Sequence, residues 1–170
     1  MNLHEALQTA IEHERHIRDH YARGAEAIVD PAGKKAFHTL AKEEQGHVAY
    51  LESRLDEWQR TGKVSTPALG TVLPSRAWLE QAVAGLGKTG PSQVANKPEL
   101  DLLKAALELE KQTSAFYRDL VAKLPEAERG LFSRFLDIED GHLAIVQAEL
   151  DALQGLGYWF DVPEFSLEAG

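Results

Sequence analysis

The sequence predicts an all-α fold, a four-helix bundle made of two helical hairpins that a long crossover connects. Four segments repeat apolar residues at the three-and-four spacing of a single helix face. The connections within each pair of segments are very short, whereas a stretch rich in Gly, Pro, Ser and Thr separates the two pairs. Of the 170 residues, 44% are hydrophobic and 26% are charged, which is typical of one globular domain.

The first two helices are predicted from their apolar stripes. The first stripe consists of Leu3, Leu7, Ala10, Ile17, Tyr21, Ala25 and Ile28. The second helix is expected to begin at Asp30-Pro31, because aspartate caps helix N-termini well and proline fits the first helical position. Its stripe consists of Phe37, Leu40, Leu51, Leu55 and Trp58. Glu14 falls inside the first stripe, and Glu44 and His47 fall inside the second, where core residues belong.

The second pair of helices repeats this arrangement. The third helix is expected to start near Pro98, and its stripe consists of Leu103, Ala106, Tyr117, Leu120 and Leu124, around Glu110. The fourth is expected after Pro125, with Gly155 as a C-terminal stop. Its stripe consists of Phe132, Phe135, Val146 and Leu153, around Glu139 and His142.

The predicted domain organisation follows from these elements. Residues 1–155 are expected to form the bundle, and residues 61–97 to form its crossover, with one short helical stretch around Trp78 to Val83. Residues 156–170 are expected to form a non-helical aromatic tail that packs on the bundle or on a partner subunit.

An internal repeat relates the two pairs of helices. Residues 10–21, "AIEHERHIRDHY", align with residues 106–117, "ALELEKQTSAFY", and share Ala, Glu, Glu and Tyr at the same offsets. Residues 44–49, "EQGHVA", align in the same way with residues 139–144, "EDGHLA". Each half therefore contains one Glu in the stripe, a Tyr seven residues later, and a Glu-x-Gly-His on the next helix.

The repeat predicts a metal site in the middle of the bundle. Residues i and i+3 share a helix face, so six ligand-type side chains are expected to converge: Glu14, Glu44, His47, Glu110, Glu139 and His142. Each tyrosine is expected to point near the Glu of its own helix. Four buried carboxylates repel one another unless they are protonated or neutralised, and two divalent cations would balance their charge. Oxygen and imidazole ligands in a helical bundle are typical of di-iron and di-manganese sites.

These motifs resemble the rubrerythrin domain of the ferritin-like superfamily, over roughly residues 3 to 154. The resemblance lies, in order, in "AIEHE" with its tyrosine, "AKEEQGH", "ALELE" with its tyrosine, and "IEDGH". It implies a ferritin-like bundle with two iron ions per chain, for which manganese or zinc could substitute. The implied roles are terminal ligands for Glu14 and Glu110, bridging ligands for Glu44 and Glu139, and one metal each for His47 and His142. Tyr21 and Tyr117 would be hydrogen-bond partners of the carboxylates, with plain core aromatics as the alternative.

The resemblance also implies an activity. Proteins of this type reduce hydrogen peroxide or O2 at the di-iron site, as peroxidases or ferroxidases that act in oxidative stress. Iron storage or sequestration is the alternative function, and a metal-free interaction bundle is a third. Rubrerythrins proper carry a Cys-ligated rubredoxin module, but this chain has no Cys, so an external protein or small reductant is the expected electron donor and no Fe-S cluster is expected.

Two further departures from the family concern single residues. The family often has an additional carboxylate three residues after the Glu of the third helix, where this sequence has Thr113. The two metal positions are therefore expected to be nearly equivalent, as the repeat suggests. Haem held by Met at a dimer interface, as in bacterioferritins, is not expected because Met1 is the only Met.

Composition limits the partners and the location. A net charge of -9 and a pI near 5.2 argue against binding to nucleic acid or to an anionic membrane surface, and cations are the more natural partners. The sequence has no run of 18 apolar residues and no signal peptide pattern at its start, so a cytoplasmic protein is expected. A homodimer or a higher homo-oligomer is the expected assembly.

Several ionisable residues near the six ligands are interpreted as solvated surface because their helical phase is wrong. The acidic members of this set are Glu12, Glu43 and Glu108. The basic members form a histidine strip on the first helix: His13, His16 and His20.

Overall fold

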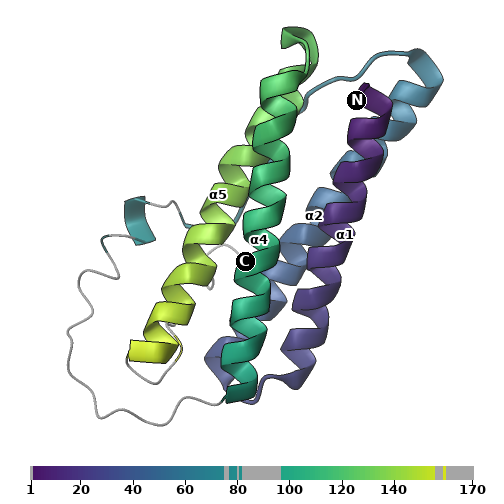
Figure 1. Ribbon diagram of the computed structural model, residues 1–170. Helices are drawn as coiled ribbons and strands as arrows, with labels where there is room; N and C mark the ends of the chain where they lie inside the picture. The colour runs from purple at the N-terminus through teal and green to yellow at the C-terminus, as the bar shows by residue number, and fades with distance from the viewer. Residues whose placement is uncertain (1, 75–76, 80, 82–96, 156–158, 160–170) are drawn as a thin grey trace.

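The computed structural model describes residues 2–74, 77–79, 81, 97–155 and 159. Within these residues the chain is helical and has no strand, and its long helices are α1 (Leu3–Ala27), α2 (Pro31–Thr61), α4 (Lys97–Lys123) and α5 (Glu126–Gly155). The helices form an elongated bundle in which α1 packs along α2, α4 packs along α5, and α1 also contacts α4 (Figure 1). The prediction of an all-α helical bundle is confirmed.

The direction of the helices explains the long connection in the sequence. The helices α1 and α5 run one way along the bundle, and α2 and α4 run the other way (Figure 1). The end of α2 and the start of α4 therefore lie at opposite ends of the molecule. A helix of this length spans about 40 Å at 1.5 Å per residue, so only a long segment can join them.

Local sequence signals define the start of α1 and both ends of α2. Asn2 and Glu5 form a capping box at the start of α1, in which each side chain bonds the backbone N–H of the other residue. The Asp30 side chain accepts hydrogen bonds from the first backbone amides of α2, directly before Pro31. Gly62 ends α2 with a positive φ of 69°, which glycine adopts without steric cost. The predicted start of α2 at Asp30-Pro31 is thus confirmed.

The apolar core is divided into two main clusters by a polar layer. One cluster includes Ile17, Tyr21, Phe37, Leu103 and Val146, and the other includes Leu7, Leu51, Tyr117, Phe132 and Phe135. On every long helix the boundary between the clusters falls at the residues that interrupt the apolar stripe. Burial of each large apolar side chain contributes about 2 kcal/mol to folding. The two clusters therefore hold the helices in place on both sides of a polar middle.

One glycine permits close packing within the first hairpin. A Cβ atom on Gly24 of α1 would lie 2.4 Å from the ring of Phe37 on α2. Glycine is thus required at this point for the aromatic ring to fill the core between the two helices.

A buried carboxylate near one end of the bundle connects three segments. Glu99 of α4 accepts hydrogen bonds from the backbone amides of Val29 and Asp30, at 3.0 and 3.3 Å, and from Trp159 Nε1, at 2.9 Å. The Trp159 ring also packs edge-on against Phe37. The predicted packing of the aromatic tail on the bundle is therefore seen at Trp159, while the tail at 156–158 and 160–170 lies outside the described residues.

The short helical stretch predicted around Trp78 to Val83 is only partly within the described residues. Residues 77–79 and 81 are helical, and residues 80, 82 and 83 lie outside the described part.

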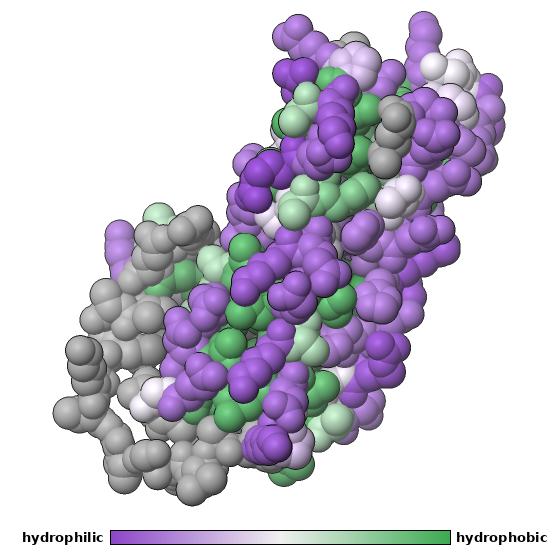
Figure 2. All heavy atoms as spheres, in the orientation of Figure 1, coloured by the Kyte–Doolittle hydropathy of each residue, from purple (hydrophilic) through white to green (hydrophobic). Residues whose placement is uncertain are grey.

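The outer surface of the bundle is mostly polar. Figure 2 shows hydrophilic side chains over most of one face, with apolar residues in narrow strips between the helices. Among the described residues, no helix is both long enough and apolar enough to cross a membrane.

Candidate metal centre

Four carboxylates and two imidazoles converge in the polar layer between the two core clusters. At most 1% of each residue is exposed, although all are ionisable: Glu14, Glu44, His47, Glu110, Glu139 and His142. The helices α1 and α4 supply one ligand-type residue each, while α2 and α5 each supply a Glu and a His one turn apart. All six residues predicted from the sequence are thus brought together.

The six side chains form two overlapping groups. One group consists of Glu14, Glu44, His47 and Glu139, and the other consists of Glu44, Glu110, Glu139 and His142. Within each group, one ligand atom per residue lies within 4.8 Å of the others. Below, the groups are called the Glu14/His47 position and the Glu110/His142 position. Glu44 and Glu139 belong to both, which is the arrangement expected of bridging carboxylates.

Both imidazoles present Nδ1 to the carboxylates. His47 Nδ1 lies 2.9 Å from Glu44, 3.2 Å from Glu14 and 3.3 Å from Glu139. His142 Nδ1 lies 2.7 Å from Glu44 and 3.7 Å from Glu139. The two rings stack with centroids 5.4 Å apart and planes 7° from parallel. Their Nδ1 atoms are therefore available for a cation that the same carboxylates would bind.

The two tyrosines bond the carboxylates of the opposite hairpin. The Tyr21 hydroxyl donates to Glu110 Oε1, and the Tyr117 hydroxyl donates to Glu14 Oε1. Each tyrosine was expected to lie near the Glu of its own helix, and this expectation was wrong, because each bonds the Glu of the other helix. Seven residues along a helix is about 10.5 Å, too far for the side chains to meet, whereas antiparallel α1 and α4 place each Tyr level with the other Glu.

Burial and mutual repulsion raise the pKa of three of the four carboxylates. Burial raises the pKa of Glu44 to about 8, with a further contribution from the charge of Glu14 and opposition from His47. Burial, together with Glu14 and Glu44, raises the pKa of Glu139 to about 7. The pKa of Glu110 lies well above its ordinary value, because of burial and the charges of Glu139 and Glu44. Three carboxylates are thus disfavoured as anions where they stand.

Glu14 and His47 pair on one side of the site, with 3.2 Å between Glu14 Oε2 and His47 Nδ1. Burial opposes the charged forms, but hydrogen bonding to His47 leaves the pKa of Glu14 below its ordinary value. The charge of Glu44 and the close approach of Glu139 and Glu14 likewise outweigh burial and leave the pKa of His47 well above its ordinary value. Burial lowers the pKa of His142, in contrast. The surroundings of His47 thus favour positive charge, at a place where a cation could bind.

Several buried polar atoms of the site make no hydrogen bond to any described residue. They are both carboxylate oxygens of Glu44 and Glu139, Oε2 of Glu110, Nε2 of His47 and both ring nitrogens of His142. Buried polar atoms without hydrogen bonds are rare and costly in proteins. Carboxylate oxygens and imidazole nitrogens are ligands for iron, manganese and zinc, so the residues fit a divalent metal pair.

The structure corrects the interpretation of one acidic neighbour. Glu12 and Glu108 are exposed, as expected. Only 11% of the Glu43 side chain is exposed, and its Oε2 lies 4.0 Å from His142 Nε2. The helical phase of Glu43 indicated the surface, but the crossover segment covers this side chain, which a single-helix pattern does not reveal.

The histidine strip on α1 is also only partly at the surface. His16 is exposed, whereas His13 is half-buried and its ring stacks on Phe116 with centroids 4.4 Å apart. A ring nitrogen of half-buried His20 lies 3.1 Å from the carbonyl oxygen of Leu102. The interpretation of all three as solvent-facing was therefore wrong for two of them, because α4 packs against this side of α1.

Thr113 borders a pocket between α1 and α4. The residue is buried, one turn after Glu110 on α4. It lines a cavity of about 260 Å³ between α1 and α4, together with His13, His16 and Gln112. A longer side chain at this position thus has space to occupy.

Comparison with known proteins returns no relative. No protein-family model, curated protein or solved structure matches the chain.

Proposed function

We propose that this chain is a di-iron carboxylate oxidoreductase that reduces hydrogen peroxide or O2 with electrons from an external donor. Its fold would be a ferritin-like bundle of the rubrerythrin type with an internal two-fold repeat. The observation that carries the proposal is the sharing of Glu44 and Glu139 by two ligand groups, each completed by one further Glu and one His. Two divalent cations would neutralise four carboxylates that are otherwise crowded in a buried layer.

In this proposal, each ion would have two ligand residues of its own and two that it shares with the other ion. Glu14 and His47 would bind one iron, Glu110 and His142 the other, and Glu44 and Glu139 both. Two bound Fe(II) ions would supply the two electrons that, with two protons, convert hydrogen peroxide to two molecules of water.

The other residues around the site orient the ligands. The Tyr117 hydroxyl bonds Oε1 of Glu14, whose Oε2 faces His47, and the Tyr21 hydroxyl bonds Oε1 of Glu110, so each tyrosine would fix the orientation of one carboxylate. Burial keeps the pKa of both tyrosines well above the ordinary value, so they remain hydrogen-bond donors at neutral pH. The aromatic and aliphatic side chains of the two core clusters keep bulk water away from the polar layer.

The electron donor lies outside this chain. Without cysteine, the sequence has no thiolate ligands for an attached iron module. A separate protein or a small reductant would return two electrons to the site after each turnover.

Anaerobic titration with Fe(II) tests the proposal directly. We expect two ions per chain, followed by oxidation when O2 or hydrogen peroxide is added and re-reduction by a chemical donor over repeated cycles. The matched control is Glu108→Gln, an exposed neighbour of Glu110, which should retain two ions. Binding of one ion or none per chain would overturn the di-iron proposal.

The size of the assembly in solution separates catalysis from storage. Light scattering that gives a dimer, with repeated turnover, supports the oxidoreductase. A closed particle of many subunits that accumulates ferric iron beyond two ions per chain would instead favour storage.

A further inference from the structure

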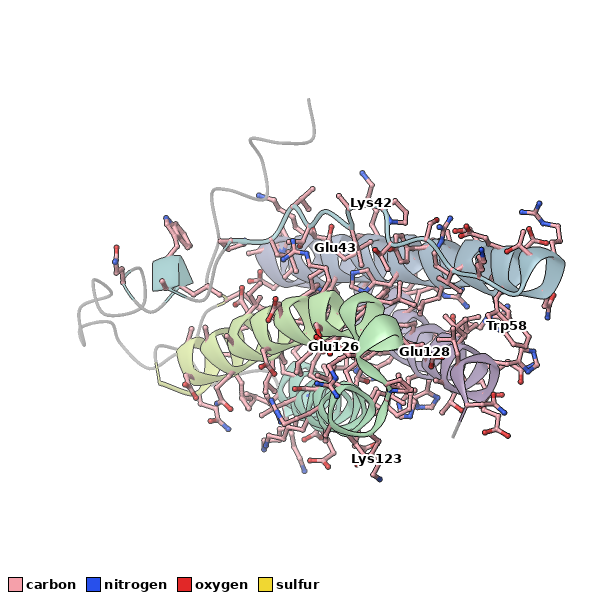
Figure 3. All side chains as sticks on the ribbon, turned by 90° about the horizontal axis from the view of Figure 1, so that it is seen from above. Lys42, Glu43, Trp58, Lys123, Glu126 and Glu128 are labelled. Carbon is pink, nitrogen blue, oxygen red and sulfur yellow. The ribbon has the colours of Figure 1, made fainter. Side chains whose placement is uncertain are left out.

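Glu43 is a nearly buried carboxylate behind one of the two histidines. It precedes the shared ligand Glu44 on α2, and its neighbour Lys42 points away from the bundle (Figure 3). Glu43 Oε2 lies 4.0 Å from Nε2 of His142, on the far side of the ring from the Nδ1 atom that faces the other carboxylates. This is longer than a hydrogen bond but within the range of a strong electrostatic contact at a buried site.

The crossover segment holds Glu43 in this place. The Thr71 hydroxyl donates a hydrogen bond of 2.5 Å to Glu43 Oε2, and the backbone amide of Val72 donates one of 3.3 Å to Oε1. Both donors come from the crossover, 28 and 29 residues after Glu43 in the sequence. The carboxylate is therefore fixed by the tertiary structure, with one oxygen turned toward the imidazole.

The other histidine lies farther from Glu43: its ligand atom is within 4.8 Å of the Glu43 carboxylate, but the pair does not come within the 4.0 Å seen at His142. The residue that the repeat aligns with Glu43 is Ile138, which is buried and apolar. Nε2 of each imidazole is buried and makes no hydrogen bond to any residue that the structure describes, and the His47 ring packs nearly perpendicular to the Phe135 ring at a centroid distance of 5.3 Å. The sequence repeat predicts two nearly equivalent metal positions, but the surroundings of the two imidazoles differ.

We propose that Glu43 is a positioning residue that makes the two metal positions unequal. The inference rests on the proposed di-metal function. An imidazole that binds a metal through Nδ1 carries its proton on Nε2, and a carboxylate facing that proton fixes the ring and makes Nδ1 a better ligand. The Glu110/His142 position therefore binds its ion more tightly than the Glu14/His47 position, and the crossover segment contributes to the difference through Thr71.

A different role for Glu43 would be direct ligation of a third ion. Glu43, His47 and His142 each offer one ligand atom within 4.8 Å of the others. Both imidazoles present Nδ1 to the shared carboxylates, however, and each would then have to give up its Nε2 proton to bind a second ion. The positioning role needs no such loss.

Chelator competition with Co(II) in single-histidine variants measures the two positions separately. His47→Ala leaves the Glu110/His142 position, and His142→Ala leaves the Glu14/His47 position. We expect Glu43→Gln to weaken Co(II) binding about 10-fold to 100-fold in the His47→Ala protein and less than twofold in the His142→Ala protein. Thr71→Val should produce a smaller loss at the same position, and Glu108→Gln should change neither.

Proton NMR of the otherwise unaltered Co(II) protein gives a second readout that does not depend on the histidine variants. The two imidazole Nε2 protons should give separate shifted signals, and Glu43→Gln should move one of them and accelerate its exchange with water. Equal losses at both positions, or none, would overturn the positioning role. A third bound ion that disappears in Glu43→Gln would assign ligation instead. Failure of the parent protein to bind Co(II) at all would reject the di-metal proposal itself.

Discussion

Tyr21 of α1 donates its hydroxyl hydrogen to Glu110 of α4, and Tyr117 of α4 donates in return to Glu14 of α1. The two bonds are reciprocal and connect the two hairpins across the site. Glu14 and Glu110 are thus each oriented by the hairpin to which they do not belong. The geometry of one metal position therefore depends on correct docking of both hairpins.

Tyr21→Phe should weaken metal binding at the Glu110/His142 position, although Tyr21 shares a helix with Glu14. Loss of an outer hydrogen-bond partner of a ligand typically costs about 10-fold or more in metal affinity. In the His47→Ala background, Co(II) titration should show this loss for Tyr21→Phe and a change below twofold for Tyr117→Phe. The His142→Ala background should give the mirror result. The same effect from both tyrosines in both backgrounds would argue against crossed bonding.

Glu44→Ala should weaken both metal positions, whereas His47→Ala should weaken mainly one. Glu44 belongs to both ligand groups and His47 to one. Isothermal titration with Fe(II) under anaerobic conditions should show no tight site in Glu44→Ala and one retained site in His47→Ala. Retention of one unaltered tight site in Glu44→Ala would contradict a bridging role for this carboxylate.

The metal-free protein should lose stability as pH rises from 6.5 to 8. The pKa values of Glu44 and Glu139 rise from 4.5 to about 8 and about 7 on folding, so the folded state holds more protons than the unfolded state across this window. The raised pKa of His47 acts in the same direction. Its contribution to folding stability is fully present below pH 6.5, the pKa of the unfolded state, and is lost as pH rises through the higher pKa of the folded state.

Two groups act in the opposite direction, but at lower pH. Because the pKa of Glu14 is lowered, its contribution to stability rises with pH but is complete by about pH 4.5. The contribution of His142 rises in the same way and is complete by about pH 6.5. Thermal melts at pH 6.5 and pH 8 with a chelator should therefore show a lower Tm at the higher pH, by about 3 °C for each kcal/mol lost. Glu44→Gln should reduce the difference, and bound metal should remove much of it. A metal-free protein that becomes steadily more stable over this range would count against crowded buried carboxylates.

Under the proposed oxidoreductase function, Thr113→Glu should increase the preference of the protein for hydrogen peroxide over O2. By the family resemblance, the extra carboxylate at this position offers one iron a further oxygen ligand, and the neutral hydroxyl of Thr113 is a weak ligand for a ferric ion. The cavity beside Thr113 gives the longer side chain space. Stopped-flow oxidation of the di-ferrous protein should show only a modest peroxide preference in the wild type and a larger one in Thr113→Glu, with Thr113→Val as the uncharged control. A wild type that already reacts orders of magnitude faster with peroxide would rule out this role for Thr113.

The sequence by itself determined the elements and the six candidate ligands. Apolar residues recur with the helical period, and Asp30-Pro31 is a local start signal that acts on its own helix. Glu14, Glu44, His47, Glu110, Glu139 and His142 interrupt these stripes at the middle of each helix, so periodicity alone places them on the buried faces. Information of this kind is local, because each residue is compared only with its neighbours on the same helix.

Only the tertiary structure decided how the helices and the crossover combine around these residues. The partner of Tyr21 depends on the antiparallel register of α1 and α4, which no spacing within one helix specifies. Burial of Glu43 depends on Thr71 and Val72, which reach α2 from the crossover. The repeat in the sequence indicated a symmetric site, whereas the segments that pack around it make the surroundings of His47 and His142 different. The electrostatic environment of a side chain depends on every charged or polar group within a few ångströms, and most of these groups belong to segments that are distant in sequence.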